Sequence, residues 1–272
     1  MIAQEKDAVF SDPSRILAIG GSITEIVHAL GLEDRLVARD STSTYPEAAL
    51  KLPDIGYMRA LSPEGVLSVS PSGILALESS GPAEAVEVLR KASVPFITVP
   101  ETFDHDGILE KIRIVGTSLG AGGAAEKLAA SVDAELAAAE KLTAGVKERK
   151  RVLFLLSMQG GKLLAAGSDT AADGIIHLAG GINAVEGFSG YKQLSDEAAL
   201  AARPDLVLMM DRGDDKAAAE DLFSHPGLAG TPAAKARKLV LMDGGYLLGF
   251  GPRTAGAIRD LATALYGEQL RN

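Results

Sequence analysis

Short apolar runs rich in β-branched residues alternate with longer segments of helical period along this chain. Parallel sheets covered by helices produce this pattern, because each strand is buried on both faces and is followed by a helix. One such helix is predicted from Ile23 to Leu30, with Ser22 as its N-cap and Gly31 after its end. Strands are expected at 15–19, 36–39, 73–77 and 96–99, and then within RVLFLLS, KLLAAG, PDLVLMM and KLVLMD.

A segment of different composition separates the two sets of strands. Residues 122–150 are dominated by Ala, Glu, Lys and Leu, which are strong helix formers, and a helix of about 24 residues would be roughly 36 Å long. Its apolar positions are mainly alanine, which disfavours a coiled coil. We therefore predict an α/β fold with two Rossmann-like lobes of mainly parallel sheets, joined by one long α-helix, with a ligand cleft between the lobes. The predicted boundaries are 1–121 for the first lobe, 122–149 for the linking helix and 150–272 for the second lobe.

The two halves also contain an internal repeat. SPEGVLSVSPSGILAL, from Ser62, matches SDEAALAARPDLVLMM, from Ser195, as S-x-E-x-x-L-x-x-x-P followed by a strand. Tyr57 and Tyr191 precede the two matching segments at nearly the same distance. Two related lobes are the simplest explanation, although capped helices before strands are common enough for a chance match.

Composition excludes several classes of protein. The chain has 272 residues and no cysteine, so disulfides, thiolate metal sites and a cysteine nucleophile are all excluded. A formal net charge of −9 argues against a nucleic-acid partner, which needs an excess of Lys and Arg. No apolar run is long enough to span a membrane, and MIAQEKDAVF is not a signal peptide. We expect either a cytosolic protein or one whose export signal has been removed.

Tyr57 is the first candidate for a binding residue. It lies in LPDIGYMRALSPEG, a polar loop that offers the ring no obvious core, and Arg59 follows two residues later, where it could hold an anion. The alternative is an ordinary half-buried aromatic residue. Tyr191 lies in the equivalent GFSGYKQLS segment, with Phe188 nearby, and we predict another loop there.

The histidines and glycines give weaker signals. His28 and His177 fall in apolar helical segments, where we expect core or half-buried side chains, whereas His105 and His225 are expected to face solvent or cap helices. The loops at the two tyrosines contain no histidine, which argues against a transition-metal cage. IGGSITEI resembles a phosphate-binding loop only weakly, and no intact catalytic motif is present.

RILAIGGSITEIVHALG, LPDIGYMRALSPEGVLSVSPSGILAL, AGSDTAADGIIHLAGGINAV and GYKQLSDEAALAARPDLVLMM together resemble the periplasmic haem-binding proteins of bacterial ABC haem importers. The resemblance covers 15–266. It implies a non-enzymatic carrier of haem, whose framework is shared with carriers of cobalamin and siderophores. GYMRALS is the segment more specific to haem.

The resemblance assigns roles to several residues. Tyr57 matches the tyrosine whose phenolate ligates the ferric haem iron, and Arg212 approximately matches the arginine that hydrogen-bonds this phenolate. Arg59 is then a candidate for supporting the ligand or binding a propionate. Some relatives use a second-lobe histidine, so His177 is a candidate. However, GIIHLAG with His177 weakly repeats EIVHALG with His28, and this equivalence favours a structural role. We predict that Tyr191 is a neutral wall residue, because two phenolates would put excess negative charge against one ferric porphyrin; the alternative is packing against Phe188.

The resemblance also implies partners and a compartment. Such carriers dock on an ABC permease in the inner membrane through one acidic residue on each lobe, and Glu84 and Glu220 are the plausible matches, although both could be ordinary solvated glutamates. We expect a periplasmic monomer, with the family's export signal missing from this sequence.

Two alternatives remain at this stage. In the first, the same fold carries cobalamin or a ferric siderophore, which the 4% aromatic content and the absence of tryptophan slightly disfavour. In the second, the chain is a nucleotide-using α/β enzyme, with the nucleotide at IGGSITEI and Asp40 as the acidic ribose partner. The broken glycine spacing counts against that enzyme.

Overall fold

The structure, a computed structural model, describes residues 8–211 and 222–271. The chain divides into two compact units, the first Met1–Ala134 and the second Glu135–Asn272. Each unit is built around its own β-sheet.

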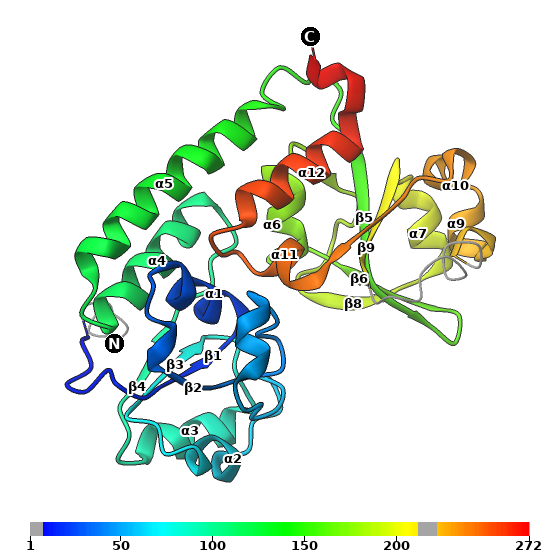
Figure 1. The fold of residues 1–272 in the computed structure, drawn as a ribbon. Coiled ribbons are helices and arrows are strands. Elements are labelled where there is room, and N and C mark those ends of the chain that lie inside the picture. The colour runs from blue at the N-terminus through cyan, green and yellow to red at the C-terminus, as the bar shows by residue number, and fades with distance from the viewer. Residues whose placement is uncertain (1–7, 212–221, 272) are drawn as a thin grey trace. The chain divides into compact units, whose positions relative to one another are not determined.

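The first unit contains four parallel strands in the order β2-β1-β3-β4. Helices α1 and α4 lie on one face of this sheet and α2 and α3 on the other (Figure 1). The elements are β1 (Ile16–Ile19), α1 (Gly21–Ala29), β2 (Leu36–Arg39), α2 (Pro63–Ser68), β3 (Gly73–Leu77), α3 (Ala83–Lys91), β4 (Phe96–Val99) and α4 (His105–Ser118), with 3₁₀ segments at Glu33–Arg35 and Glu47–Lys51.

The four strands predicted for this unit are confirmed, three of them at the predicted residues. Every residue of β1 and β3 is buried. Central strands of this kind appear in a sequence as continuous apolar runs, which explains the agreement.

The start of α1 differs from the prediction. The helix begins at Gly21, and the N-cap is Gly20 at φ 119°, a backbone conformation suited to glycine. Ser22 therefore lies in the first turn instead of at the cap, and its Oγ accepts a hydrogen bond from the Nζ of Lys111 at 3.3 Å. The prediction of Ser22 as the N-cap is wrong because the helix starts earlier.

The second unit contains a six-stranded sheet in the order β10-β9-β5-β6-β8, with β7 also paired to β5. Helices α6, α11 and α12 lie on one face, and α7, α9 and α10 on the other (Figure 1). The β5-β6 and β6-β8 pairs are antiparallel, whereas the other pairs are parallel. The elements are β5 (Arg151–Gln159), β6 (Lys162–Ala166), α6 (Ala171–Leu178), β7 (Ile182–Asn183), β8 (Tyr191–Leu194), α7 (Asp196–Ala202), β9 (Leu206–Asp211), α9 (Pro226–Ala229), α10 (Pro232–Ala236), β10 (Leu239–Asp243), α11 (Gly244–Leu248), α12 (Thr254–Tyr266) and the 3₁₀ segment Gly267–Arg271.

Helix α5 (Gly122–Lys141) joins the first unit to the second. It has 20 residues, fewer than the 24 expected. Two ion pairs connect it to α4, one between His105 and Asp133 at 2.8 Å and one between Arg113 and Glu126 at 3.0 Å. The domain boundaries at 121/122 and 149/150 stay predictions.

The internal repeat is visible in two equivalent helix starts. The Ser62 hydroxyl accepts a hydrogen bond from Gly65 N at 3.3 Å at the start of α2, and the Ser195 hydroxyl accepts one from Ala198 N at 3.2 Å at the start of α7. Each helix leads into a parallel strand, β3 or β9. The two serines that begin the matching segments therefore have the same role, as N-caps of α2 and α7.

Among residues 8–211 and 222–271, no helix combines the length and the apolar character needed to cross a bilayer.

Candidate functional site

The Tyr57 side chain is presented on the surface of the first unit, in the loop between the Glu47–Lys51 segment and α2. It is 46% exposed. Its backbone oxygen accepts a hydrogen bond from Ala60 N at 2.8 Å. Within the part of the chain that the structure describes, the phenol oxygen has no hydrogen-bond partner. A free phenol on a fixed backbone is available to an incoming ligand.

The loop before Tyr57 is fixed against the end of β2. Three main-chain hydrogen bonds hold it, from Arg39 N to Pro53 O at 2.9 Å, from Ile55 N to Arg39 O at 3.0 Å and from Ser41 N to Gly56 O at 2.9 Å. These bonds make the loop a short extension of the sheet edge. Gly56 has φ +96°, where other residues are strained, and this lets the chain turn immediately before the tyrosine.

Met58 anchors the loop on the other side of Tyr57. Its side chain is buried, and its backbone oxygen accepts a hydrogen bond from Gly81 N at 2.9 Å. Arg59 is exposed, and no ion pair to its guanidinium occurs among the described residues. The loop therefore offers a phenol and a guanidinium two residues apart. A phenol oxygen can ligate a metal ion, and a guanidinium can pair with an anion.

The hydroxyl groups of two other tyrosines are already hydrogen-bonded within the protein. The Tyr266 hydroxyl is buried and donates to Gly180 O at 2.7 Å. The Tyr246 hydroxyl donates to Asp260 at 2.9 Å, and burial followed by this carboxylate raises the pKa of Tyr246 to about 12. Neither hydroxyl is free to bind an added ligand.

Tyr191 lies on a strand, although we predicted a loop. It is the first residue of β8, is half-buried, and packs edge-on against Phe154 with ring centroids 6.4 Å apart at 66°. The polar, exposed middle of β8 gives little strand signal, which explains the wrong prediction. Phe188 forms a cation–π contact with Lys192 at 5.6 Å.

His177 is also placed differently from the prediction. Its side chain is 58% exposed, so the expected core or half-buried position is wrong. Ile175 and Ile176 form the buried side of α6, and the next residue along the helix turns away from them. The His177 Nδ1 lies 2.9 Å from the Asp173 backbone oxygen, one helical turn earlier.

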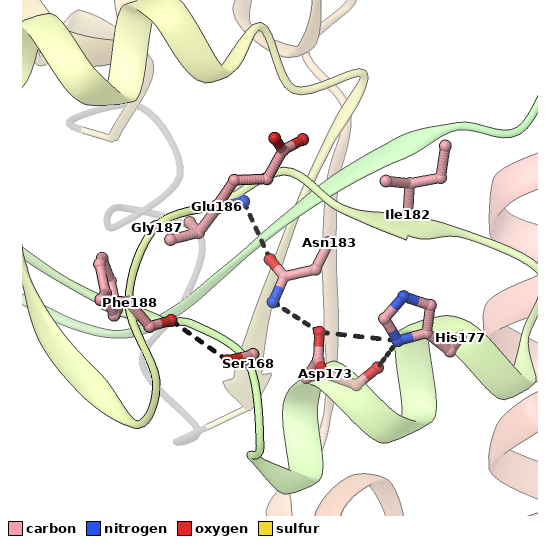
Figure 2. Close-up of a pocket in the computed structure, with 9 residues that line it drawn as sticks. Ser168, Asp173, His177, Ile182, Asn183, Glu186, Gly187 and Phe188 are labelled. Carbon is pink, nitrogen blue, oxygen red and sulfur yellow. Dashed lines mark hydrogen bonds and ion pairs between the residues drawn. The ribbon is translucent and has the colours of Figure 1, made fainter.

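Figure 2 shows a pocket that His177 lines. The volume of this pocket is about 350 Å³. Asn183 donates to Asp173 Oδ1 at 2.9 Å and accepts a hydrogen bond from Val185 N at 3.0 Å, so its amide is engaged within the pocket wall. Asp173 and Glu186 supply carboxylates to the lining, and no Lys or Arg from residues 8–211 or 222–271 lines it. This charge is unfavourable for a ligand that carries carboxylates.

The remaining candidates divide into described and undescribed residues. Arg212 and Glu220 lie outside the described residues. Glu84 is exposed in the first turn of α3. No group of three or more His, Asp or Glu side chains in the described ranges is arranged to hold a metal ion.

Asp40 is a residue whose role the sequence did not reveal. Its carboxylate is fully buried and accepts four hydrogen bonds from the protein itself. Both of its oxygens are thus occupied, which leaves no acceptor for a ribose hydroxyl. The nucleotide-enzyme alternative loses its acidic ribose partner.

Comparison with protein families identifies the architecture. The model of a family described as periplasmic binding protein matches residues 16–246. Among curated proteins, an uncharacterised ABC transporter substrate-binding lipoprotein, YvrC of Bacillus subtilis, is 27% identical over 263 residues, covering 96% of this chain and 82% of that protein. The vitamin B12-binding protein of Vibrio campbellii is 24% identical over 207 residues, covering 73% of this chain and 74% of that protein.

Solved structures give higher similarity. The apo form of the periplasmic heme-binding protein RhuT from Roseiflexus sp. RS-1 is 42% identical with a TM-score of 0.88, covering 93% of this chain and 98% of that one. BhuT, a periplasmic heme-binding protein in complex with two hemes, is 40% identical with a TM-score of 0.87, covering 92% and 97%. HutB of Vibrio cholerae, another periplasmic heme-binding protein, is 33% identical with a TM-score of 0.82, covering 94% and 100%.

Proposed function

The chain belongs to the periplasmic binding protein family, and we propose that it is the periplasmic carrier that delivers ferric haem to an ABC permease in the inner membrane. The structures named above that bind haem are 33–42% identical to it over nearly their whole length. The observation that carries the proposal is the exposed Tyr57 phenol, free of partners among the described residues, with Arg59 two residues away. Binding and release of the cargo are the whole activity, without a catalytic step.

Tyr57 is proposed as the axial ligand of the haem iron. On binding, its hydroxyl loses a proton to solvent and the phenolate oxygen bonds to the ferric ion. The ferric charge favours that anion, and Arg59 is proposed to support the bound phenolate. Arg59 is alternatively placed to pair with a haem propionate, as a guanidinium pairs well with a carboxylate.

Arg212 and Tyr191 complete the proposed binding residues. Arg212 is proposed to hydrogen-bond the Tyr57 phenolate. Tyr191 is proposed as a neutral wall residue, because a second phenolate on one ferric porphyrin would lack a compensating charge. Tyr191 packs edge-on against Phe154 and is half-buried, and both observations support a role as a wall residue that contacts the ligand without ligating the iron.

Cobalamin is the second candidate cargo, because several curated relatives are vitamin B12-binding proteins at 24–29% identity. Haem is favoured over cobalamin by the higher identity of the haem-binding structures. It is also favoured by the free phenol of Tyr57, since a ferric ion is a good partner for phenolate.

Thermal unfolding with each cargo tests the assignment. A ligand at a hundred times its dissociation constant stabilises the folded state by about 2.7 kcal/mol. For a chain of this size that corresponds to an increase in melting temperature of roughly 5–10 °C. We expect ferric haem to give this increase, whereas cobalamin and a ferric siderophore at equal concentration give none. An increase with cobalamin alone would overturn the haem assignment.

Docking on the permease is proposed to use acidic surface residues. Glu84 is the predicted first-unit residue, with Glu220 as its counterpart. The repeat supplies a second pair, because Glu64 and Glu197 occupy equivalent positions in α2 and α7 and are both exposed. Changing each pair to lysine and measuring ATP hydrolysis by the permease in vesicles distinguishes them. The variant of the true docking pair should no longer stimulate ATP hydrolysis by the permease, and it should bind haem with unchanged affinity.

A further inference from the structure

The carboxylate of Asp40 is the centre of a buried hydrogen-bond network at the end of β2. Its Oδ1 accepts hydrogen bonds from Gly20 N at 2.9 Å and from the Ser43 hydroxyl at 2.7 Å. Its Oδ2 accepts hydrogen bonds from Thr42 N at 2.9 Å and from the Thr42 hydroxyl at 2.6 Å. The side chain is fully buried. Asp40 thereby fixes the turn at 41–43 to Gly20, the N-cap residue of α1.

The same turn supports both neighbours of Tyr57. On one side, Ser41 N donates a hydrogen bond to Gly56 O at 2.9 Å. On the other, the Thr42 hydroxyl lies 3.9 Å from the sulfur of Met58, which is buried. Tyr57 is held between these two residues, while its own side chain is exposed. The position of the phenol therefore depends on the turn that Asp40 holds.

We propose that Asp40 is a positioning residue for the iron ligand, acting on Tyr57 through the 41–43 turn to fix the phenolate for haem binding. This inference rests on the proposed function. It assigns to Asp40 a contribution to haem retention that is separate from its contribution to stability. Substitution of a residue that orients a metal ligand commonly lowers metal affinity by about 10- to 100-fold.

The chemistry of the network requires a carboxylate. Four donors converge on the two oxygens, and two of them are backbone N–H groups that cannot reverse their role. An asparagine amide would have to point its NH₂ group at either Gly20 N or Thr42 N, whichever way it is turned. Asp40→Asn thus displaces the turn while keeping the size of the side chain.

A double-mutant cycle tests the inference, with the rate of haem loss to an excess of a haem-scavenging apoprotein as the readout. We expect Asp40→Asn to speed haem loss by about 10-fold or more in the wild-type background. In the Tyr57→Phe background the same substitution should change the rate less than twofold, because the ligand that it positions is gone. Thr42→Val, which removes one donor to Asp40 and keeps the side-chain size, should act in the same direction and serves if Asp40→Asn does not fold.

Asp104→Asn is the matched control. Asp104 caps α4 in the same unit by accepting a hydrogen bond from Gly107 N at 2.8 Å, and within the described part of the chain it makes no hydrogen bond to Tyr57 or its two neighbours. It should lower the melting temperature without changing the rate of haem loss.

The possible outcomes are distinguishable. Equal acceleration by Asp40→Asn with and without the Tyr57 phenol would overturn the positioning role, as would an unchanged rate in both Asp40→Asn and Thr42→Val. If the wild-type haem complex lacks a phenolate-to-iron charge-transfer band, or if Tyr57→Phe keeps it, the proposed iron ligand is wrong. The absorption spectrum shows that failure separately from the rates of the cycle.

Discussion

Replacing Lys111 with methionine should remove a pH dependence from the stability of the protein. Lys111 is almost completely buried, and its ammonium group donates to the Ser22 hydroxyl at 3.3 Å. Burial lowers its pKa from 10.5 to about 8, although the nearby carboxylates of Glu101 and Glu25 act in the opposite direction. Lys111→Met keeps the length of the side chain and removes the titrating group.

The sign follows from proton binding. Between about pH 8 and 10.5, Lys111 holds its proton in the unfolded chain and has lost it in the folded one. Because the unfolded state then binds more protons, the free energy of unfolding rises with pH in this window. At 1.36 kcal/mol per pKa unit, the gain between pH 7 and pH 10 is roughly 2–3 kcal/mol.

Urea unfolding of both proteins at pH 7 and pH 10 measures this effect. The free energy of unfolding of the wild type, minus that of Lys111→Met, should increase by roughly 2–3 kcal/mol from the lower to the higher pH. Lys127→Met, at an exposed position of α5, is the control and should not change the wild-type pH dependence. A difference that stays constant between the two pH values would refute the reasoning, and one that decreases would mean that attraction to Glu25 and Glu101 outweighs burial.

Three further predictions concern the second unit and its packing. Tyr191→Phe should keep the charge-transfer band in the absorption spectrum of the haem complex and weaken haem binding by no more than about 1.5 kcal/mol, the contribution of one hydrogen bond; loss of the band would make Tyr191 the ligand. Gly167→Ala should lower the free energy of unfolding in urea by about 2 kcal/mol, because the added Cβ would lie 2.1 Å from Phe188 O. An unchanged unfolding midpoint would show that the backbone relaxes to accommodate the methyl group. Ser195→Ala should cost about 1 kcal/mol by removing the cap of α7, and a loss below about 0.3 kcal/mol in the same assay would contradict that role.

The sheet of the first unit was largely predictable from sequence. Its strands are buried on both faces, so β-branched apolar runs identify them directly. Strand β8 was not predicted, because its central residues are exposed and polar, as is usual for a strand at the edge of a sheet. The short strand β7 was not predicted either, because two residues are too few to show an alternation of apolar and polar side chains.

The candidate site was predictable only in part. A tyrosine in a polar loop, followed by Arg59, is visible in the sequence, and so Tyr57 could be selected. The proposed role of Asp40 was not visible, because it depends on the N-cap residue of α1, Gly20, and the 41–43 turn converging on one carboxylate in space. His177 was misplaced because a helix with two buried isoleucines can still turn its next residue into solvent.

The absorption spectrum of the ferric haem complex, recorded for the wild type and for Tyr57→Phe, tests the proposed function most directly. The account predicts a phenolate-to-iron charge-transfer band in the wild-type complex and its loss in Tyr57→Phe, with haem released faster by the variant. A wild-type complex without the band, or a Tyr57→Phe complex that retains it at full strength, would contradict the assignment of Tyr57 as the iron ligand.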